Sequence, residues 1–366
     1  MNKEITTRRI SSLDGIRGLA VIMVVMFHYL CHPLELSSTA SKTWHLVGKA
    51  IGFGWIGVDL FFVLSGFLIG GILLNNRESK NYFTTFYIRR SLRILPPYFL
   101  LLITFYLIGN FIGNTAYYTF ENPLPFWGYL TFTQNFLMGL SNHFGAGGLT
   151  PTWSLAIEEQ FYILCPLLIW FVKPKYIPWI LIIVILIGPI SRFLVDDWHK
   201  AYVWFHCRVD SLSIGVLIAW LYKYKYEPIN KRKNMLIYLM LFFATLVAFS
   251  ELLFGNLGAI SHTLIALFFG SLILTLLYFP QSQVTKIFES RFLVYFGGIS
   301  YSLYLFHNLI NCILHQVILQ NKQPILETKY DVMITISATI LSISLTTLLK
   351  RFLEDPLIKI GKKRSY

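Results

Sequence analysis

Long apolar runs constrain this chain more than any other feature of its sequence. Runs such as Ile177 to Ile190 and Leu264 to Phe279 approach the roughly 20 apolar residues that a membrane-spanning helix needs. Only 13% of the 366 residues are charged, whereas a soluble domain carries about 25%. The short alternating segments that are typical of outer-membrane barrel strands are not seen in the sequence. The sequence therefore predicts an all-α, polytopic bundle of membrane helices.

The apolar runs divide into about ten candidate spans, each with boundaries uncertain by a few residues. They lie near 13–32, 52–74, 94–113, 153–172, 176–195, 205–222, 234–253, 258–280, 293–318 and 331–349. A further segment, 126–140, is apolar but short and interrupted by polar residues. We interpret it as a re-entrant or interfacial segment, because irregular backbone at membrane depth lines a cavity or is buried in protein.

The basic residues give the expected orientation. In polytopic proteins Lys and Arg accumulate in cytoplasmic loops, so the net charge of +13 does not indicate nucleic acid. With the N-terminus in the cytoplasm, the inner segments hold 23 of the 31 Lys and Arg residues. We therefore expect one membrane domain over residues 1–366, in the cytoplasmic (inner or plasma) membrane, with both termini cytoplasmic.

Ionisable residues inside the spans are the candidate functional residues, because each costs roughly 2.5–3.5 kcal/mol at mid-membrane. Arg17 and His28 are eleven residues apart, which puts them on one face of the first helix. Asp59 in the second span needs a partner, and we expect His28 or Arg17, because neighbouring spans with short connections pack together. A purely structural ion pair remains an alternative.

Two further motifs carry charge. PTWSLAIEEQFY predicts a helix that begins near Pro151. Its adjacent acids Glu158 and Glu159 point about 100° apart, so at most one faces a given cavity squarely. FYIRRSLRILPPYF places Arg90 and Arg93 on one helical face, where they could bind phosphates or act only as topogenic charge.

Polar residues also occur in RVDSLSIG, which contains Arg208 and Asp210, and in SYSLYLFHNLI, which contains His307 and Asn308. These residues could line the same cavity or merely pack the bundle. The four cysteines show no metal-ligand spacing, and we expect no metal. Basic groups at one end and a histidine with carboxylates further along are suited to binding a phosphorylated donor and handling an acyl group.

Six segments in this order resemble the acyltransferase-3 family of membrane O-acyltransferases, over nearly the whole chain. They are SLDGIRGLAVIMVVMFHY, GVDLFFVLSGFLI, FYIRRSLRILPPYF, PTWSLAIEEQFY, RVDSLSIGVLIAWLY and SYSLYLFHNLI. The resemblance implies a bundle of about ten helices. It also implies transfer of an acyl group, usually acetyl, from cytoplasmic acetyl-CoA or another acyl-CoA to an extracytoplasmic carbohydrate. Such acceptors include lipopolysaccharide O-antigen, exopolysaccharide and peptidoglycan. Some members carry an esterase-like domain after the bundle; this chain ends at Tyr366, soon after the last expected span.

The resemblance maps the family's essential arginine and histidine onto Arg17 and His28, its RxxR motif onto Arg90 and Arg93, and its WSL…E motif onto 153–158. We expect His28 to be the central catalytic residue, acting on the acceptor hydroxyl as a base or carrying the acyl group itself. The expected catalytic set is His28, Asp59 and Glu158, and the expected donor-binding set is Arg17, Arg90 and Arg93. The expected acceptor-binding residues are Trp153, Ser154, Glu159, Arg208 and His307. Acylation of a small-molecule glycoside and transport of a lipid-linked sugar are the alternatives.

Overall fold

The computed structural model describes residues 10–37, 48, 52–112, 118–195, 197–254, 258–321 and 323–366. Across these ranges every regular element is a helix and no strand occurs, so the predicted all-α class is confirmed. Six of the basic residues used to predict the orientation lie outside the described residues: Lys3, Arg8, Arg9, Lys42, Lys49 and Lys322.

Eight helical segments in the described ranges are long and apolar enough to cross a membrane. They are Ser11–Leu36, Gly52–Asn75, Tyr82–Phe111, Gly147–Phe171, Ile177–Leu194, Gly258–Tyr278, Arg291–Leu319 and Lys329–Lys362. The chain is therefore a polytopic helical membrane protein. Their main helices are α1 (Ser11–Met26), α4 (Gly57–Asn75), α5 (Tyr82–Ile112), α8 (Thr152–Phe171), α9 (Ile177–Leu194), α14 (Ser261–Tyr278), α16 (Arg291–Leu319) and α17 (Lys329–Leu349).

One of the ten expected spans is shorter than predicted. Helix α11 (Val209–Tyr224) has 16 residues, fewer than the roughly 20 that a straight crossing needs. Helix α13 (Asn234–Phe254) has 21 residues and covers the expected span 234–253. Helix α5 is longer than predicted, because it begins at Tyr82 rather than near residue 94. The segment FYIRRSLR is therefore helical.

The segment 126–140 forms two short helices, α6 (Phe126–Leu130) and α7 (Gln134–Ser141), neither long enough to cross a bilayer. The other short elements connect or extend the long helices. They are η1 (Phe27–Cys31), α2 (His32–Leu36), η2 (Gly52–Ile56), η3 (Gly147–Leu149), α10 (Trp198–Val203), η4 (Phe205–Cys207), α12 (Tyr226–Asn230), η5 (Gly258–Ile260), α15 (Gln283–Phe288), η6 (Lys350–Glu354) and α18 (Asp355–Lys362).

The centre of the bundle is built on close contacts between helix backbones. A Cβ atom added to Gly66 of α4 would lie 2.0 Å from the carbonyl oxygen of Leu212 in α11, and one added to Gly215 would lie 2.2 Å from that of Val63. Gly18 of α1 and Gly297 of α16 meet in the same way. Small residues let membrane helices approach this closely, because apolar side chains gain little by leaving apolar lipid. These contacts fix α4 against α11 and α1 against α16.

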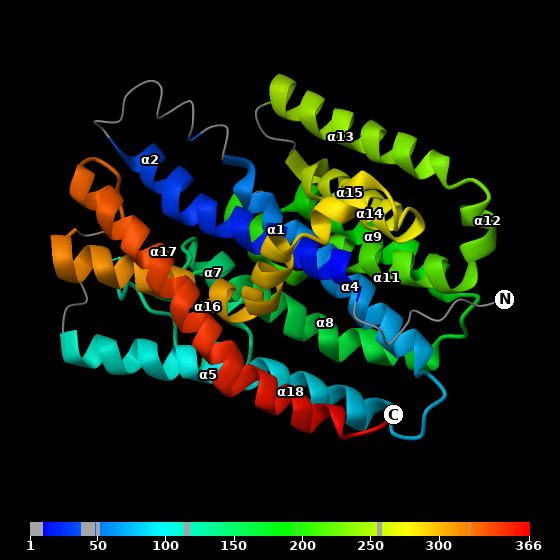
Figure 1. Cartoon of the computed structure of the whole chain (residues 1–366), viewed down its shortest axis with the longest axis horizontal. Coiled ribbons are helices and arrows are strands. Elements are labelled where there is room, and N and C mark those ends of the chain that lie inside the picture. Colours follow the sequence, from blue (N-terminus) through cyan, green and yellow to red (C-terminus); the bar gives the residue numbers. More distant parts are fainter. Residues whose placement is uncertain are drawn as a thin grey trace.

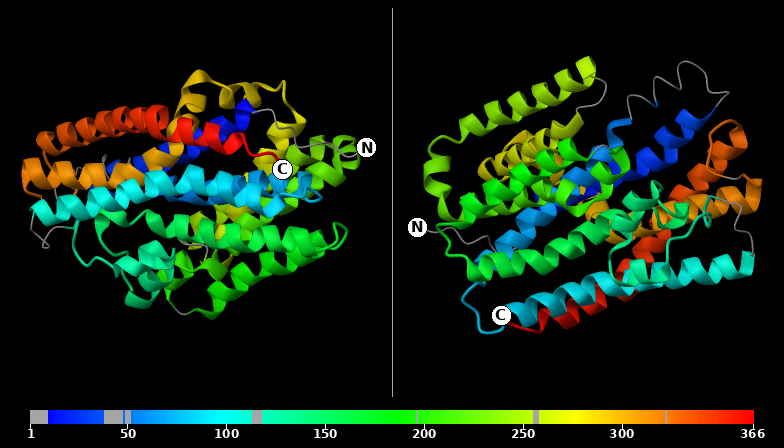
Figure 2. Two further views of the ribbon diagram at one scale, coloured as in Figure 1. Left: turned by 90° about the horizontal axis from the view of Figure 1, so that it is seen from below. Right: turned by 180° about the vertical axis from the view of Figure 1, so that it is seen from behind.

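The remaining helices surround this centre. Helices α5 and α18 lie side by side along one edge of the bundle, and α13 lies along the opposite edge (Figure 1). The same arrangement is seen from behind in Figure 2. Thr85 of α5 donates a hydrogen bond to the carbonyl oxygen of Ser365 at 2.9 Å, and Arg89 donates one to that of Arg364. The residues after α18 are thereby attached to the start of α5.

Candidate active site

The first cavity, which we call the arginine cavity, has a volume of about 430 Å³ and lies between α1, α4, α5, α8 and α16. Its charged lining residues are Arg17, Arg90, Arg93, Lys362, Asp14 and Glu158. Four of these are cations and two are carboxylates. Arg17 Nη1 lies 3.1 Å from Asp14 Oδ1. The cavity has a surplus of positive charge, which favours an anionic ligand.

The prediction that Arg90 and Arg93 share one helical face is confirmed, because both line this cavity. The guanidinium of Arg90 lies 5.6 Å from the centre of the Tyr162 ring, within the range of a cation–π contact. Guanidinium groups bind phosphate oxygens through paired hydrogen bonds, so two arginines one helical turn apart suit a phosphorylated ligand.

Glu158 belongs to the arginine cavity, and it accepts a 3.2 Å hydrogen bond from the Tyr162 hydroxyl. The prediction that at most one of the adjacent acids faces a given cavity is confirmed for this cavity, because Glu159 is not among its lining residues. Glu158 and His28 line different cavities.

The second cavity, which we call the histidine cavity, has a volume of about 690 Å³, within the usual range of small-molecule sites. Its lining includes three histidines, His28, His32 and His262, together with a set of aromatic side chains. These aromatic residues are Phe27, Trp55, Tyr118, Phe144, Trp153, Trp198, Tyr202 and Tyr304. Burial raises the pKa of Tyr202 to about 12, so its hydroxyl stays protonated and can donate a hydrogen bond.

His28 occupies η1, a turn of π-helix between α1 and α2. Single π turns inside α-helices occur frequently at functional sites. Nδ1 of His28 lies 3.0 Å from the carbonyl oxygen of Val24 and 3.1 Å from Nε2 of His307. Nδ1 of His307 faces the carbonyl oxygens of Leu303 and Tyr304, at 3.0 and 2.8 Å.

These contacts define the proton positions of the two neutral imidazoles. Carbonyl oxygens only accept, so Nδ1 of His307 carries its proton and Nε2 is an acceptor. We therefore assign the proton of His28 to Nδ1, which donates to His307 and Val24. The lone pair of His28 is then on Nε2, the nitrogen that a base or nucleophile must present. His307 itself is fully buried, is not among the residues lining either cavity, and lies behind His28.

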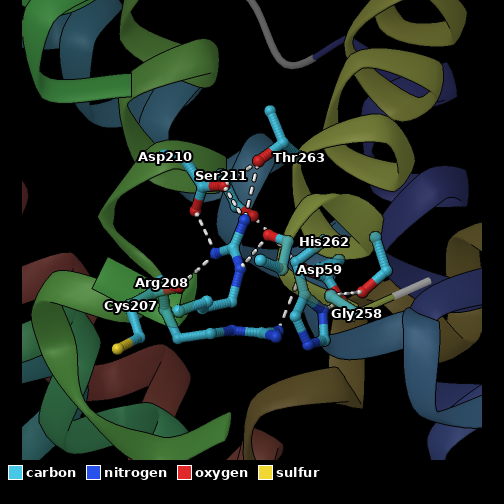
Figure 3. Close-up of polar contacts among 11 residues, drawn as sticks. Asp59, Cys207, Arg208, Asp210, Ser211, Gly258, His262 and Thr263 are labelled. Carbon is cyan, nitrogen blue, oxygen red and sulfur yellow. Dashed lines mark hydrogen bonds and ion pairs between the residues drawn. The ribbon is translucent and has the colours of Figure 1, made fainter. Parts of the chain in front are cut away.

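Asp59 has other partners than predicted. It accepts hydrogen bonds from Arg208 Nη2 at 2.9 Å and Ser211 Oγ at 3.2 Å, and its Oδ2 lies 3.2 Å from Nδ1 of His262 (Figure 3). The expectation that Asp59 pairs with His28 or Arg17 is wrong. We expected spans that are neighbours in the chain to pack together. Instead, α4 packs closely on α11, which places Arg208 opposite Asp59.

Arg208 is fully buried and is not one of the lining residues of the histidine cavity. Its guanidinium lies 5.3 Å from the ring centre of Tyr202 and 5.8 Å from that of Trp153, two aromatic residues that line the cavity. A second buried pair adjoins it, in which Arg192 Nη2 lies 2.8 Å from Asp210 Oδ2. Arg208 is therefore placed to support the cavity wall from behind.

A thin partition separates the two cavities. Val58 and Tyr304 line both of them. The Tyr304 hydroxyl lies 2.5 Å from Oγ of Ser154 and donates to the carbonyl oxygen of Pro151 at 3.2 Å. Two neighbouring residues of α8 face opposite sides, because Trp153 lines the histidine cavity and Ser154 the arginine cavity. The two sites therefore meet back to back at Tyr304.

Sequence reasoning missed His262, Lys362 and Tyr304. Tyr304 belongs to the segment SYSLYLFHNLI, where a hydroxyl among apolar residues could have indicated a functional side chain. His262 follows an expected span boundary closely, and Lys362 is one of several basic residues near the C-terminus, so neither stood out. In the described ranges no group of three or more His, Cys, Asp or Glu residues is arranged to hold a metal ion. The four cysteines are free and buried.

The fold and the paired cavities define a polytopic membrane protein with two adjoining cavities. Residues 10–350 match the acyltransferase-3 family, described as an acyltransferase domain, and the chain belongs to this family. It is 30% identical to the Staphylococcus aureus (strain COL) protein named "Putative O-acetyltransferase SACOL0978", over 97% of this chain and 58% of the relative. It is 28% identical to O-acetyltransferase OatA of S. aureus (strain NCTC 8325), over 99% of this chain and 59% of the relative. The chain thus spans less than two thirds of these relatives. No solved structure matches it.

Proposed function

We propose that this protein is a membrane O-acyltransferase of the cytoplasmic membrane. It takes an acyl group, acetyl in the first instance, from acyl-CoA in the arginine cavity. It transfers that group to a hydroxyl of an extracytoplasmic glycan in the histidine cavity. The observation that carries the proposal is the position of these two cavities back to back, with a surplus of cations on one side of Tyr304 and His28 on the other.

The arginine cavity fits the donor. Acyl-CoA carries its negative charge on phosphates at one end and its thioester at the end of a long flexible arm. Arg17, Arg90, Arg93 and Lys362 supply the cations for the phosphates. The excess of basic residues in the expected inner segments supports a cytoplasmic opening for this cavity, where acyl-CoA is available.

The histidine cavity fits a carbohydrate acceptor. Sugar rings stack their apolar faces on aromatic side chains, and Trp153, Trp198 and Tyr202 all line this cavity. The relatives named O-acetyltransferases support an oxygen acceptor and an acetyl group for this chain. Lipopolysaccharide O-antigen, exopolysaccharide and peptidoglycan are the acceptor classes that the proposal covers.

His28 is the central catalytic residue of the proposal. Its Nε2 lone pair acts on the acyl group that reaches the partition between Val58 and Tyr304, either as a base for the acceptor hydroxyl or as the nucleophile that carries the acyl group. Glu158, with Tyr162, lies on the donor side, in the same cavity as the cations. Asp59 and Arg208 form a buried ion pair behind the lining of the histidine cavity and support it.

The test uses the purified full chain in proteoliposomes, with radiolabelled acetyl-CoA and a crude envelope glycan fraction. We expect label in the glycan with the wild type. His28→Asn keeps a donor at the position of Nδ1 but removes the Nε2 lone pair, so it should bind acetyl-CoA normally and transfer nothing. Label retained on the wild-type protein without glycan would identify the covalent route. Glycan transport without labelling, or normal transfer by His28→Asn, would overturn the proposal.

A further inference from the structure

His28 and His32 are not alone in the histidine cavity, because a third imidazole, that of His262, lines it as well. His262 lies in the first turn of α14, is 8% exposed and lines the cavity together with His28. Its ring is 5.4 Å from that of Trp55 and 5.9 Å from that of Tyr202, both of which line the same cavity. His262 is therefore among the groups that a bound acceptor would meet.

Asp59 determines which nitrogen of the His262 imidazole carries the proton. A carboxylate only accepts hydrogen bonds, so Nδ1 of His262, which lies 3.2 Å from Asp59 Oδ2, carries the proton. The lone pair is then on Nε2. Asp59 is in turn held by Arg208 and Ser211, both fully buried (Figure 3). A buried carboxylate that orients an imidazole and stabilises its protonated form is the arrangement that general-base histidines require.

We infer that His262, oriented by Asp59, is the general base that accepts the proton of the acceptor hydroxyl in the histidine cavity. The inference rests on the proposed function and assigns separate tasks to His28 and His262, two of the three imidazoles that line this cavity. His28, whose Nδ1 is engaged by His307 and Val24, then has the second of its two proposed roles, as the nucleophile that carries the acyl group beside the partition. His262 acts at the acceptor.

The step balances without any further reactant. The acceptor oxygen forms a bond to the acyl carbonyl carbon, and its proton passes to Nε2 of His262. The bond between that carbon and its carrier breaks, and the carrier keeps the electron pair. The carrier is His28, which was acylated on Nε2 with release of CoA thiolate and now leaves as the neutral imidazole. The Asp59 carboxylate offsets the charge on protonated His262, which then releases its proton to water.

A structural role for His262 makes a different prediction from a catalytic one. If His262 served only to satisfy Asp59, any side chain with a donor at the position of Nδ1 would replace it. Asparagine supplies such a donor through its amide but has no group equivalent to Nε2. His262→Asn therefore retains the structural contact and removes the base. His206→Asn is the matched control, because His206 lines neither cavity.

The experiment measures three quantities for the wild type, His262→Asn and His206→Asn in detergent. They are the Kd for acetyl-CoA, the slow hydrolysis of acetyl-CoA with water as acceptor, and label transfer to the envelope glycan fraction. We expect His262→Asn to bind acetyl-CoA like the wild type while hydrolysis and transfer both fall by about 10²- to 10⁴-fold. His206→Asn should match the wild type in all three.

Transfer and hydrolysis at the wild-type rate in His262→Asn would overturn the inference and leave the proposed function intact. If His262→Asn fails to fold, His262→Ala with added imidazole decides: restored transfer supports the base, and no restoration overturns it. A wild-type protein that neither hydrolyses acetyl-CoA nor labels glycan would overturn the proposed function and this inference with it.

Discussion

Nδ1 of His28 lies 3.1 Å from Nε2 of His307, so the catalytic candidate on η1, the continuation of α1, is oriented by a fully buried imidazole on α16. The two residues are 279 positions apart in the chain. They meet because Gly18 and Gly297 let α1 and α16 pack backbone against backbone. The orientation of His28 therefore depends on the distant packing contact between Gly18 and Gly297.

Removal of the His307 ring should lower kcat more than it changes the KM for acetyl-CoA. In His307→Ala, His28 keeps only its contact with Val24, and a misplacement of about 1 Å can cost on the order of 100-fold in rate. His307→Gln offers an acceptor near the position of Nε2 and should recover part of the loss. Steady-state kinetics with acetyl-CoA measure both parameters. An unchanged kcat in His307→Ala, or equal losses in both variants, would show that His307 does not orient His28.

The arginine cavity predicts an effect on donor affinity. Arg90→Gln or Arg93→Gln should raise the KM for acetyl-CoA by roughly 10- to 100-fold each, because hydrogen bonds to charged groups contribute about 1.5–3 kcal/mol. Lys362→Gln should raise it less, because a lysine binds phosphate as a point charge rather than through a planar fork. The value of kcat should change little in all three.

Arg89→Gln is the control for these substitutions. Arg89 precedes Arg90 directly but contacts the Tyr366 ring and the carbonyl oxygen of Arg364 instead of lining the cavity. Its KM should stay near that of the wild type. An equal rise in the Arg89 and Arg90 variants would mean that net positive charge, and not the cavity, determines donor affinity.

The Asp59–Arg208 pair should contribute strongly to stability. Both side chains are completely buried, and removal of one partner of such a pair costs about 3–5 kcal/mol, because the other charge remains buried. Arg208→Met should therefore lower the Tm in detergent, and Asp59→Leu combined with Arg208→Met should recover part of the loss. Lys350→Met is the control, because the Lys350–Asp355 pair is partly exposed and worth about 0–1 kcal/mol. Equal effects of Arg208→Met and Lys350→Met would contradict this account.

The close contact between α4 and α11 predicts that Gly66 tolerates no side chain. A Cβ there would lie 2.0 Å from the carbonyl oxygen of Leu212, a backbone atom that cannot move aside locally. Gly66→Ala should destabilise the fold by about 1–3 kcal/mol. Gly361→Ala should be harmless, because the atoms nearest to a Cβ added there, among them Cα of Arg89, are 3.5 Å away. Thermal unfolding in detergent, followed by size-exclusion chromatography, compares the two; similar stability would argue against the contact.

Local patterns in the sequence predicted the helical membrane class and the shared face of Arg90 and Arg93 correctly. Both follow from hydropathy and from the helical repeat, which act over a few residues. The partners of Asp59 could not be found in this way. Arg208 is 149 residues and His262 203 residues away in the chain, so their meeting depends on which helices pack together. The π turn that carries His28 also left no trace in the hydropathy pattern.

The partition of Val58 and Tyr304 has a consequence for the permeability barrier of the membrane. A transporter carries a whole solute across by opening first to one side and then to the other, with large movements of its helices. Here the two cavities already meet at a pair of side chains, so in the proposed reaction only the small acyl group has to pass Tyr304. CoA and the glycan each stay on their own side, and no rocking motion or ion gradient is required. Such a protein would deliver acyl groups outward while the membrane remains sealed to ions, at the expense of the thioester bond alone.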